Sequence, residues 1–450
     1  MQTRSNNSLF LLLGALVVGG CGDLTVPDYN NPGIENLQNS PTRAAVRDLA
    51  TGLLIGARAN ITDRTGYVSQ LGILGRESYT LDISDPRYIT ELLVGPITNS
   101  GAFGAGLWTD RYRNIRNANI LLSSVDQVAT FSDAEKEAIR GYAKTIQALD
   151  FLLVINTRDT NGAPIEVGGT IDQLAPIESK ARVFAHIVKL LDEGQAHLQA
   201  GGAAFPFPLS SGFAGFNTPA TFLRFNRALK ARVDVYMGSY AQALTSLQGS
   251  FLNTGSPLTL GVYHTYGTGS DAPNQLATVV LYAHPSLVTN AERQPNGAVD
   301  RRVQTKIQTH PQPTSLLGVG SDLQFTLYAT PSASVPIIRN EELILLRAEA
   351  RWFTGNRAGA MEDLNFVRVN SGGLAPIGAP ATDAAFVTEL LKQRRYSLLF
   401  EGGHSWIDAR RFGRLEQLPR DRTDHSFIRA FLIPEAECLA RTAGSSTCAA

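Results

Sequence analysis

Hydrophobic residues recur at three- and four-residue steps along much of the chain, which is the pattern of amphipathic helices. Phe222, Phe225, Leu229 and Val233 follow this spacing and share one face of a predicted helix. We expect helices near residues 107–129, 133–157, 177–200, 220–237 and 239–248. Strand-like runs such as ATVVLYA and QFTLYAT are short. The pattern therefore predicts an all-α fold.

Local signals mark where two of these helices begin and end. Ser132 and Glu135 form a capping box before the helix over residues 133–157. Thr218 followed by Pro219 provides an N-cap and a first helical position. Gly238 ends that helix, and a new helical pattern begins at once, so a helical hairpin is expected.

A second segment repeats the chemistry of this hairpin. Residues 346–364 align with residues 229–247 when Gly355 is placed on Gly238, and small and aromatic residues then coincide. A turn glycine with small residues at the crossing is typical of tetratricopeptide-type repeats. The alternative is that two unrelated hairpins meet the same packing demand. We predict a tetratricopeptide-like scaffold of helical hairpins.

Two Gly-, Pro- and Ser-rich stretches interrupt the helical pattern, at residues 201–216 and about 253–335. Long irregular segments inside a compact scaffold are usually functional loops. We therefore expect a loop-rich capping subdomain, and we look there for binding surfaces.

The N-terminus has the pattern of an exported lipoprotein. Residues 1–20 combine an early Arg4 with a short apolar stretch, and Cys21 follows two glycines. The apolar stretch is too short to span a membrane, which needs about 20 residues. We predict a signal peptide over residues 1–20, lipidation of Cys21, and a tether over residues 21–42. An ordinary secretory signal with an incidental cysteine is the alternative.

The charge balance and the few cysteines argue against nucleic-acid and metal binding. The 40 basic residues balance the 40 acidic residues, and neither sign forms a block, which argues against nucleic-acid binding. After Cys21, only Cys438 and Cys448 remain, and export would let them form a disulfide. Two cysteines without nearby histidines are too few for a metal site.

Familiar catalytic motifs are missing from the sequence. The chain has no GxxxxGK loop, no CxxC, no HExxH and no GxSxG, and its seven histidines lie far apart. We therefore predict a protein that is not an enzyme and that needs no cofactor. A carbohydrate hydrolase with two unsignalled carboxylates stays open as an alternative.

Carboxylates that are close in sequence have structural interpretations. Glu341 and Glu342 lie at a predicted helix start, where negative charge suits the helix dipole. Glu401 and Asp408 flank Trp406 among several arginines. This arrangement favours an internal ion-pair network over a catalytic pair.

Aromatic residues with polar neighbours are the candidates for ligand binding. Arg76, Glu77 and Tyr79 lie in a mixed stretch after a helical pattern, and Trp108 and Tyr112 lie four residues apart on one helical face. Aromatic rings can stack on the apolar faces of sugars while polar groups bind the hydroxyls. The alternative for Trp108 and Tyr112 is that both are core residues.

The sequence resembles the SusD/RagB family of outer-membrane nutrient-binding lipoproteins. The resemblance rests on the CGDL at Cys21 and on the segments LWTDRYRNIRNANILLSSV, RGYAKTIQALDFLLVI, IIRNEELILLRAEARWFTGNRAGAMEDLNFVR, RRYSLLFEGGHSWIDARRFG and FLIPEAE. One departure lies after Glu401 and Gly402, where the family tends to have Arg and this chain has Gly403, His404 and Ser405.

The resemblance implies a SusD-like helical repeat domain over residues 43–450. It also implies a lipid-anchored protein, exposed at the cell surface of the outer membrane, that captures an oligosaccharide or peptide and delivers it to a TonB-dependent, SusC-like transporter. A helical-repeat scaffold that binds only protein is the main alternative to this function.

Overall fold

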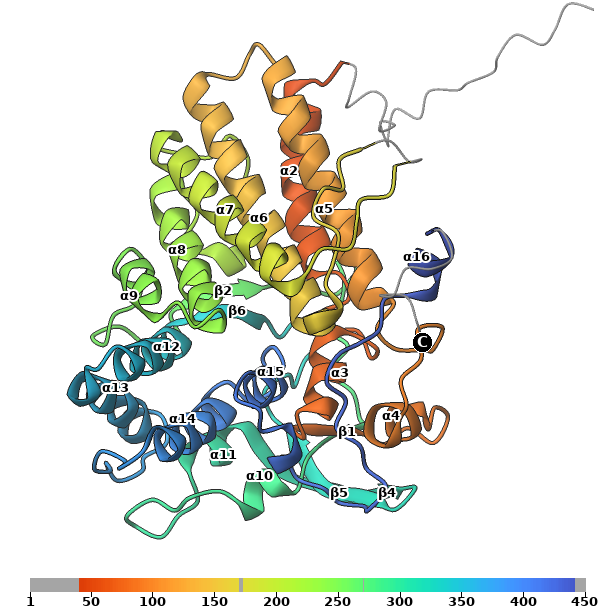
Figure 1. The fold of residues 1–450 in the computed structure, drawn as a ribbon, viewed down its shortest axis with the longest axis vertical. Coiled ribbons are helices and arrows are strands. Elements are labelled where there is room, and N and C mark those ends of the chain that lie inside the picture. The colour runs from red at the N-terminus through yellow and green to blue at the C-terminus, as the bar shows by residue number, and fades with distance from the viewer. Residues whose placement is uncertain (1–39, 170–172, 270, 442–450) are drawn as a thin grey trace, which may run out of the picture.

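The computed structural model describes residues 40–169, 173–269 and 271–441, and Figure 1 shows their arrangement. The predicted signal peptide, Cys21, most of the predicted tether and Cys448 lie outside these residues. The longer helices are α2 (Arg43–Arg58), α5 (Gly106–Ser124), α6 (Asp133–Arg158), α7 (Lys180–Ala200), α8 (Pro219–Tyr236), α9 (Tyr240–Gln248), α12 (Asn340–Phe353), α13 (Arg357–Asn370) and α14 (Asp383–Ser397).

Most of these helices form pairs, and the pairs stack into a curved row. α2 packs on α5, α6 on α7, α8 on α9 and α12 on α13, while α5–α6, α7–α8 and α9–α12 contacts join successive pairs. The row bends from α2 past α8 to α13 (Figure 1). The predicted all-α, tetratricopeptide-like scaffold is confirmed.

Helix starts follow the predicted capping signals. The Ser132 hydroxyl accepts a hydrogen bond from the N–H of Glu135, and the Glu135 carboxylate accepts one from the N–H of Ser132. Thr218 caps α8, with Pro219 in its first turn. Each capping bond satisfies an N–H that the helix itself leaves unpaired.

The two aligned glycines occupy equivalent turns. Gly238 lies between α8 and α9 with φ of +73°, and Gly355 lies between α12 and α13 with φ of +91°. Residues with a Cβ rarely adopt this backbone conformation. The two sequence segments therefore form the matching hairpins that their alignment predicts.

The loop-rich part lies below and to one side of this row (Figure 1). Its short helices are α3 (Tyr67–Leu74), α4 (Arg87–Ile89), α10 (Ser286–Thr289), α11 (Arg301–Lys306), α15 (His404–Arg411) and α16 (Glu435–Leu439). Three small antiparallel sheets pair β1 (Ser78–Thr80) with β3 (Leu281–Ala283), β2 (Gly261–His264) with β6 (Val335–Arg339), and β4 (Ile307–Leu316) with β5 (Val319–Phe325).

Glu401 and Asp408 belong to an internal ion-pair network, as predicted, although Arg395 of the same segment pairs with no carboxylate of the described residues. Arg339 donates from Nε to the Glu401 carboxylate at 2.8 Å, and Arg394 donates from Nε to Asp408 at 2.6 Å. All four side chains are buried, and Trp406 beside them has no exposed surface. Both carboxylates are therefore held by arginine side chains.

None of the helices in the described part of the chain is long and apolar enough to cross a membrane. Within that same part, no group of three or more His, Cys, Asp or Glu side chains could hold a metal ion.

Candidate functional site

Arg76, Glu77 and Tyr79 are buried, and the expectation that they face a ligand at the surface is wrong. Their exposed fractions are 1%, 0% and 1%. Arg76 donates from Nη2 to the carbonyl of Ser426 at 2.8 Å and from Nε to that of Pro419 at 3.1 Å. This guanidinium therefore ties the C-terminal loop to the body of the protein.

Tyr79 belongs to a hydrogen-bond cluster in which Tyr79 and His284 are buried and Asp421 lies at the surface. Its hydroxyl donates to the Asp421 carboxylate at 2.6 Å, and His284 Nε2 lies 3.0 Å from the same oxygen. The N–H of Ser286 donates to His284 Nδ1, so Nε2 carries the imidazole proton and donates it to Asp421. The cluster joins β1, the segment after β3 and the C-terminal loop, which is a structural role.

Glu77 is also enclosed. One carboxylate oxygen accepts a hydrogen bond from the N–H of Phe400 at 3.4 Å, and the other makes none with any described residue. Burial raises the pKa of Glu77 to about 8, so this carboxyl group is protonated at neutral pH.

Trp108 and Tyr112, in contrast, line a common cavity of about 240 Å³, which we call the Trp108 cavity. Both come from α5, and their ring centroids lie 4.6 Å apart with an angle of 46° between the rings. Arg116 of α5 also lines it, and the remaining lining residues come from the segment between α6 and α7 and from the C-terminal segment: Pro164, Val167, Gly169, Gln173, Leu174, Ala175, Glu437 and Arg441.

The aromatic wall of the Trp108 cavity is firmly held. Trp108 is 5% exposed, and the Arg158 guanidinium lies 5.3 Å from its ring centroid. The Tyr112 hydroxyl donates to the carbonyl of Pro164 at 2.8 Å, so the ring contributes its face and not its hydroxyl. The two rings thus form a fixed apolar surface, while also belonging to the core as the alternative interpretation expected.

Polar groups lie at the rim of the same cavity. Arg116 and Gln173 are exposed, and neither forms a hydrogen bond or ion pair with a described residue. Arg441 is paired with Glu437. An aromatic wall bordered by unengaged polar side chains can hold a sugar ring and bind its hydroxyl groups.

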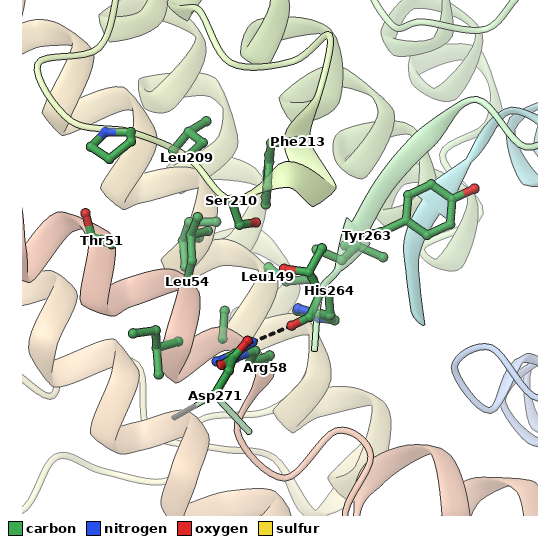
Figure 2. A pocket seen from close by; sticks show the side chains of 16 residues that line it. Thr51, Leu54, Arg58, Leu149, Leu209, Ser210, Phe213, Tyr263, His264 and Asp271 are labelled. Carbon is green, nitrogen blue, oxygen red and sulfur yellow. Dashed lines mark hydrogen bonds and ion pairs between the residues drawn. The ribbon is translucent and has the colours of Figure 1, made fainter. Parts of the chain in front are cut away.

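A second cavity of about 250 Å³ lies between α2 and β2, and we call it the α2–β2 cavity. Figure 2 shows Leu54, Leu149 and Phe213 on its walls, with the Arg58–Asp271 ion pair at one end. Arg58 also donates a hydrogen bond to the carbonyl of Thr265.

His264 is the unusual group of the α2–β2 cavity. Its side chain is 8% exposed and makes no hydrogen bond with any described residue. Burial, with the nearby charges of Arg111 and Arg58, lowers the pKa of His264 to about 3, so the imidazole is neutral. A neutral imidazole offers one donor and one acceptor to a ligand. No sequence motif or spacing singles out His264, because segments distant in sequence build the cavity.

Comparison with solved structures shows what this architecture resembles. A SusD-like carbohydrate-binding protein from Bacteroides fragilis NCTC 9343 superposes with a TM-score of 0.69, covering 90% of this chain and 99% of that chain at 14% identity. The chain has the fold of the SusD superfamily. The fold that the sequence resemblance predicted is therefore confirmed.

Other SusD-fold structures agree. A SusD superfamily protein from Bacteroides vulgatus ATCC 8482 gives a TM-score of 0.65, with 87% of this chain and 96% of that chain covered at 15% identity. A laminarin-binding SusD-like protein gives 0.55, with 87% and 97% covered at 16% identity. No protein-family model and no curated protein matches the sequence.

Proposed function

We propose that this SusD-fold protein is a cell-surface oligosaccharide-binding lipoprotein that belongs to the SusD/RagB family and has no turnover of its own. The observation that carries the proposal is the fold match along nearly the whole length of proteins described as carbohydrate-binding and laminarin-binding. The capture of Glu401 and Asp408 by arginines supports a binding protein over a hydrolase.

The Trp108 cavity is the proposed ligand site. A sugar ring stacks on the Trp108 and Tyr112 rings, while Arg116 and Gln173 bind its hydroxyls. The neutral His264 in the α2–β2 cavity makes that cavity the second candidate site for a neutral sugar. A peptide ligand is the alternative to an oligosaccharide at either site.

Variants at the rim test the Trp108 cavity without disturbing the core. Replacing Trp108 itself would cost about 3–5 kcal/mol of stability, because the ring is buried. We therefore choose Arg116→Ala and Gln173→Ala, with Arg113→Ala as the control. Arg113 is exposed on the same helix and is paired with Asp110 outside the cavity.

The assay is a glycan array with the full chain, followed by calorimetric titration of the oligosaccharides that bind. Each rim variant should weaken binding about tenfold through a lost hydrogen bond, and the control should bind as the unaltered protein does. Equal affinity in all variants would reject this cavity, and loss of binding in His264→Leu would then assign the α2–β2 cavity. Release of shorter products would indicate a hydrolase.

Delivery to a transporter and attachment by lipid extend the proposal. Cys21 after two glycines supports lipidation, and the SusD/RagB resemblance supports a TonB-dependent, SusC-like partner in the outer membrane. Cys21→Ser should move the protein from the membrane fraction to the soluble fraction. If the variant stays in the membrane fraction, the lipid is not the anchor.

A further inference from the structure

A third cavity, of about 400 Å³, lies between α14 and α15, and we call it the α14–α15 cavity. These elements are separate in Figure 1 from α5 and α16, which border the Trp108 cavity. Its lining residues are Asn290, Thr388, Leu391, Lys392, Arg395, Tyr396, Ser405, Asp408, Ala409, Arg414, Gln417, Leu418 and Pro419.

Arg395 carries a positive charge that no carboxylate of the described chain neutralises. Its Nη2 donates to the carbonyl of Arg76 at 3.0 Å and to the Ser286 hydroxyl at 2.8 Å. Its Nε is buried without a partner, and Nη1 makes no hydrogen bond to a described residue. The neighbouring carboxyl group is Glu77, which is protonated at neutral pH because its pKa is about 8.

The other charges on the wall do not cancel that of Arg395. Arg414 donates to the Thr388 hydroxyl at 2.7 Å and to the carbonyl of Ala384 at 2.8 Å, without a carboxylate partner among the described residues. Lys392 is paired with Glu292 at 3.0 Å.

Asp408 is the one carboxylate among the described lining residues, and other arginines neutralise its charge. Arg394 and Arg411 both bind it, at 2.6 and 2.9 Å. The α14–α15 cavity therefore carries two guanidinium groups, those of Arg395 and Arg414, without an anionic partner.

The rest of the wall is apolar. Leu391, Ala409, Leu418 and Pro419 line it together with the ring of Tyr396. A ligand that fills this space therefore presents an apolar body to these side chains and an anionic group to the guanidinium groups.

We propose that the α14–α15 cavity binds a small organic carboxylate, with the carboxylate on Arg395 and the apolar body against Tyr396 and Leu418, while Arg414 adds a second positive charge at the edge of the cavity. A guanidinium group that is removed from water and lacks an anion is costly for the protein. A carboxylate accepts the free N–H groups of a guanidinium fork in charge-assisted hydrogen bonds. This site is separate from the proposed oligosaccharide site and does not depend on it.

Benzoate and benzamide are a matched pair of probes for this proposal. They have the same ring and nearly the same shape, and they differ in the anionic group. Calorimetric titration of the full chain at constant ionic strength should give benzoate at least about a tenfold advantage over benzamide. Inorganic phosphate, titrated in parallel, distinguishes an organic carboxylate from a simple oxyanion.

Two variants test which arginine side chains attract the carboxylate of benzoate. Arg395→Gln removes the charge, together with the Nη2 donor to the carbonyl of Arg76 and the Ser286 hydroxyl, and should remove the preference for benzoate. Arg414→Gln lies at the edge of the cavity and should reduce benzoate affinity severalfold even if the first variant unfolds. Arg113→Gln, exposed on α5, is the control and should bind benzoate unchanged.

The proposal is overturned if benzoate and benzamide bind equally, if benzoate fails to bind at millimolar concentration, or if Arg414→Gln leaves its affinity unchanged. Binding of phosphate without benzoate would also overturn the assignment to an organic carboxylate. Oligosaccharide affinity serves as a separate readout, because both cavity variants should leave it unchanged.

Discussion

The buried Glu77 makes a quantitative prediction about how stability depends on pH. Its side chain has no exposed surface, and burial raises its pKa from the ordinary 4.5 to about 8. Between these values the folded protein keeps a proton on Glu77 that the unfolded chain has released. The free energy of unfolding therefore falls as pH rises through this window.

The size of the effect follows from the pKa difference. Each unit of difference is worth about 1.4 kcal/mol, so Glu77 costs about 3 kcal/mol of stability on going from pH 4.5 to 7. Glu77→Gln keeps the acceptor for the N–H of Phe400 and has no proton to lose. The variant should gain stability relative to the unaltered protein by about this amount over the same range.

Urea unfolding at several pH values, followed by tryptophan fluorescence, measures this difference. Glu362→Gln is the control, because Glu362 is exposed on α13 and its replacement should not produce the trend. A stability difference between Glu77→Gln and the unaltered protein that stays constant from pH 4.5 to 8 would refute the reasoning.

Three further predictions test the scaffold and the C-terminus. Arg232 and Glu342 form a buried ion pair at 2.6 Å. Arg232→Met should lower the free energy of unfolding by about 3–5 kcal/mol, because it leaves the Glu342 charge unpaired, and adding Glu342→Leu should recover most of the loss. Additive losses of the two substitutions in urea unfolding would contradict this. Gly238→Ala should lower the free energy of unfolding by about 1 kcal/mol, because φ at this position is +73°, while the added Cβ meets no atom within 4 Å. An unchanged thermal midpoint would show that the backbone conformation does not require glycine. Cys438 is disulfide-bonded and its partner lies outside the described residues, so the pairing with Cys448 is still a prediction. Thiol labelling of the unfolded chain should modify Cys438 and Cys448 only after reduction. Labelling of both cysteines without reductant would reject the pairing.

Local signals in the sequence predicted the scaffold well. The caps at Ser132 and Thr218 act on N–H groups three residues away, and the turn glycines at 238 and 355 act within their own hairpins. Interactions of such short range can be recognised from spacing alone. The helices over residues 106–158 therefore lie close to where their patterns place them.

The candidate site could be predicted only in part, for a physical reason. Trp108 and Tyr112 come together because one helix turn separates them. The burial of Tyr79 depends on His284 and Asp421, more than 200 residues further along the chain, and spacing does not reveal such partners. Its polar neighbours in sequence made Tyr79 resemble a surface residue, although long-range packing encloses it.

The surroundings of His264 and Arg395, which line the other two cavities, could not be predicted from the sequence either. Spacing in the sequence singles out neither residue: among the described residues, the His264 side chain makes no hydrogen bond and Arg395 has no carboxylate partner. A missing partner becomes visible only when distant segments have been placed around the side chain.

The most direct test of the central claim is whether the protein associates with an outer-membrane transporter. The tagged full chain is purified under mild conditions from the detergent-solubilised outer membrane of its own host, and co-purifying proteins are identified by mass spectrometry. We predict a TonB-dependent barrel in near-equal amount. Recovery of the tagged protein without such a barrel would contradict the proposed role in uptake.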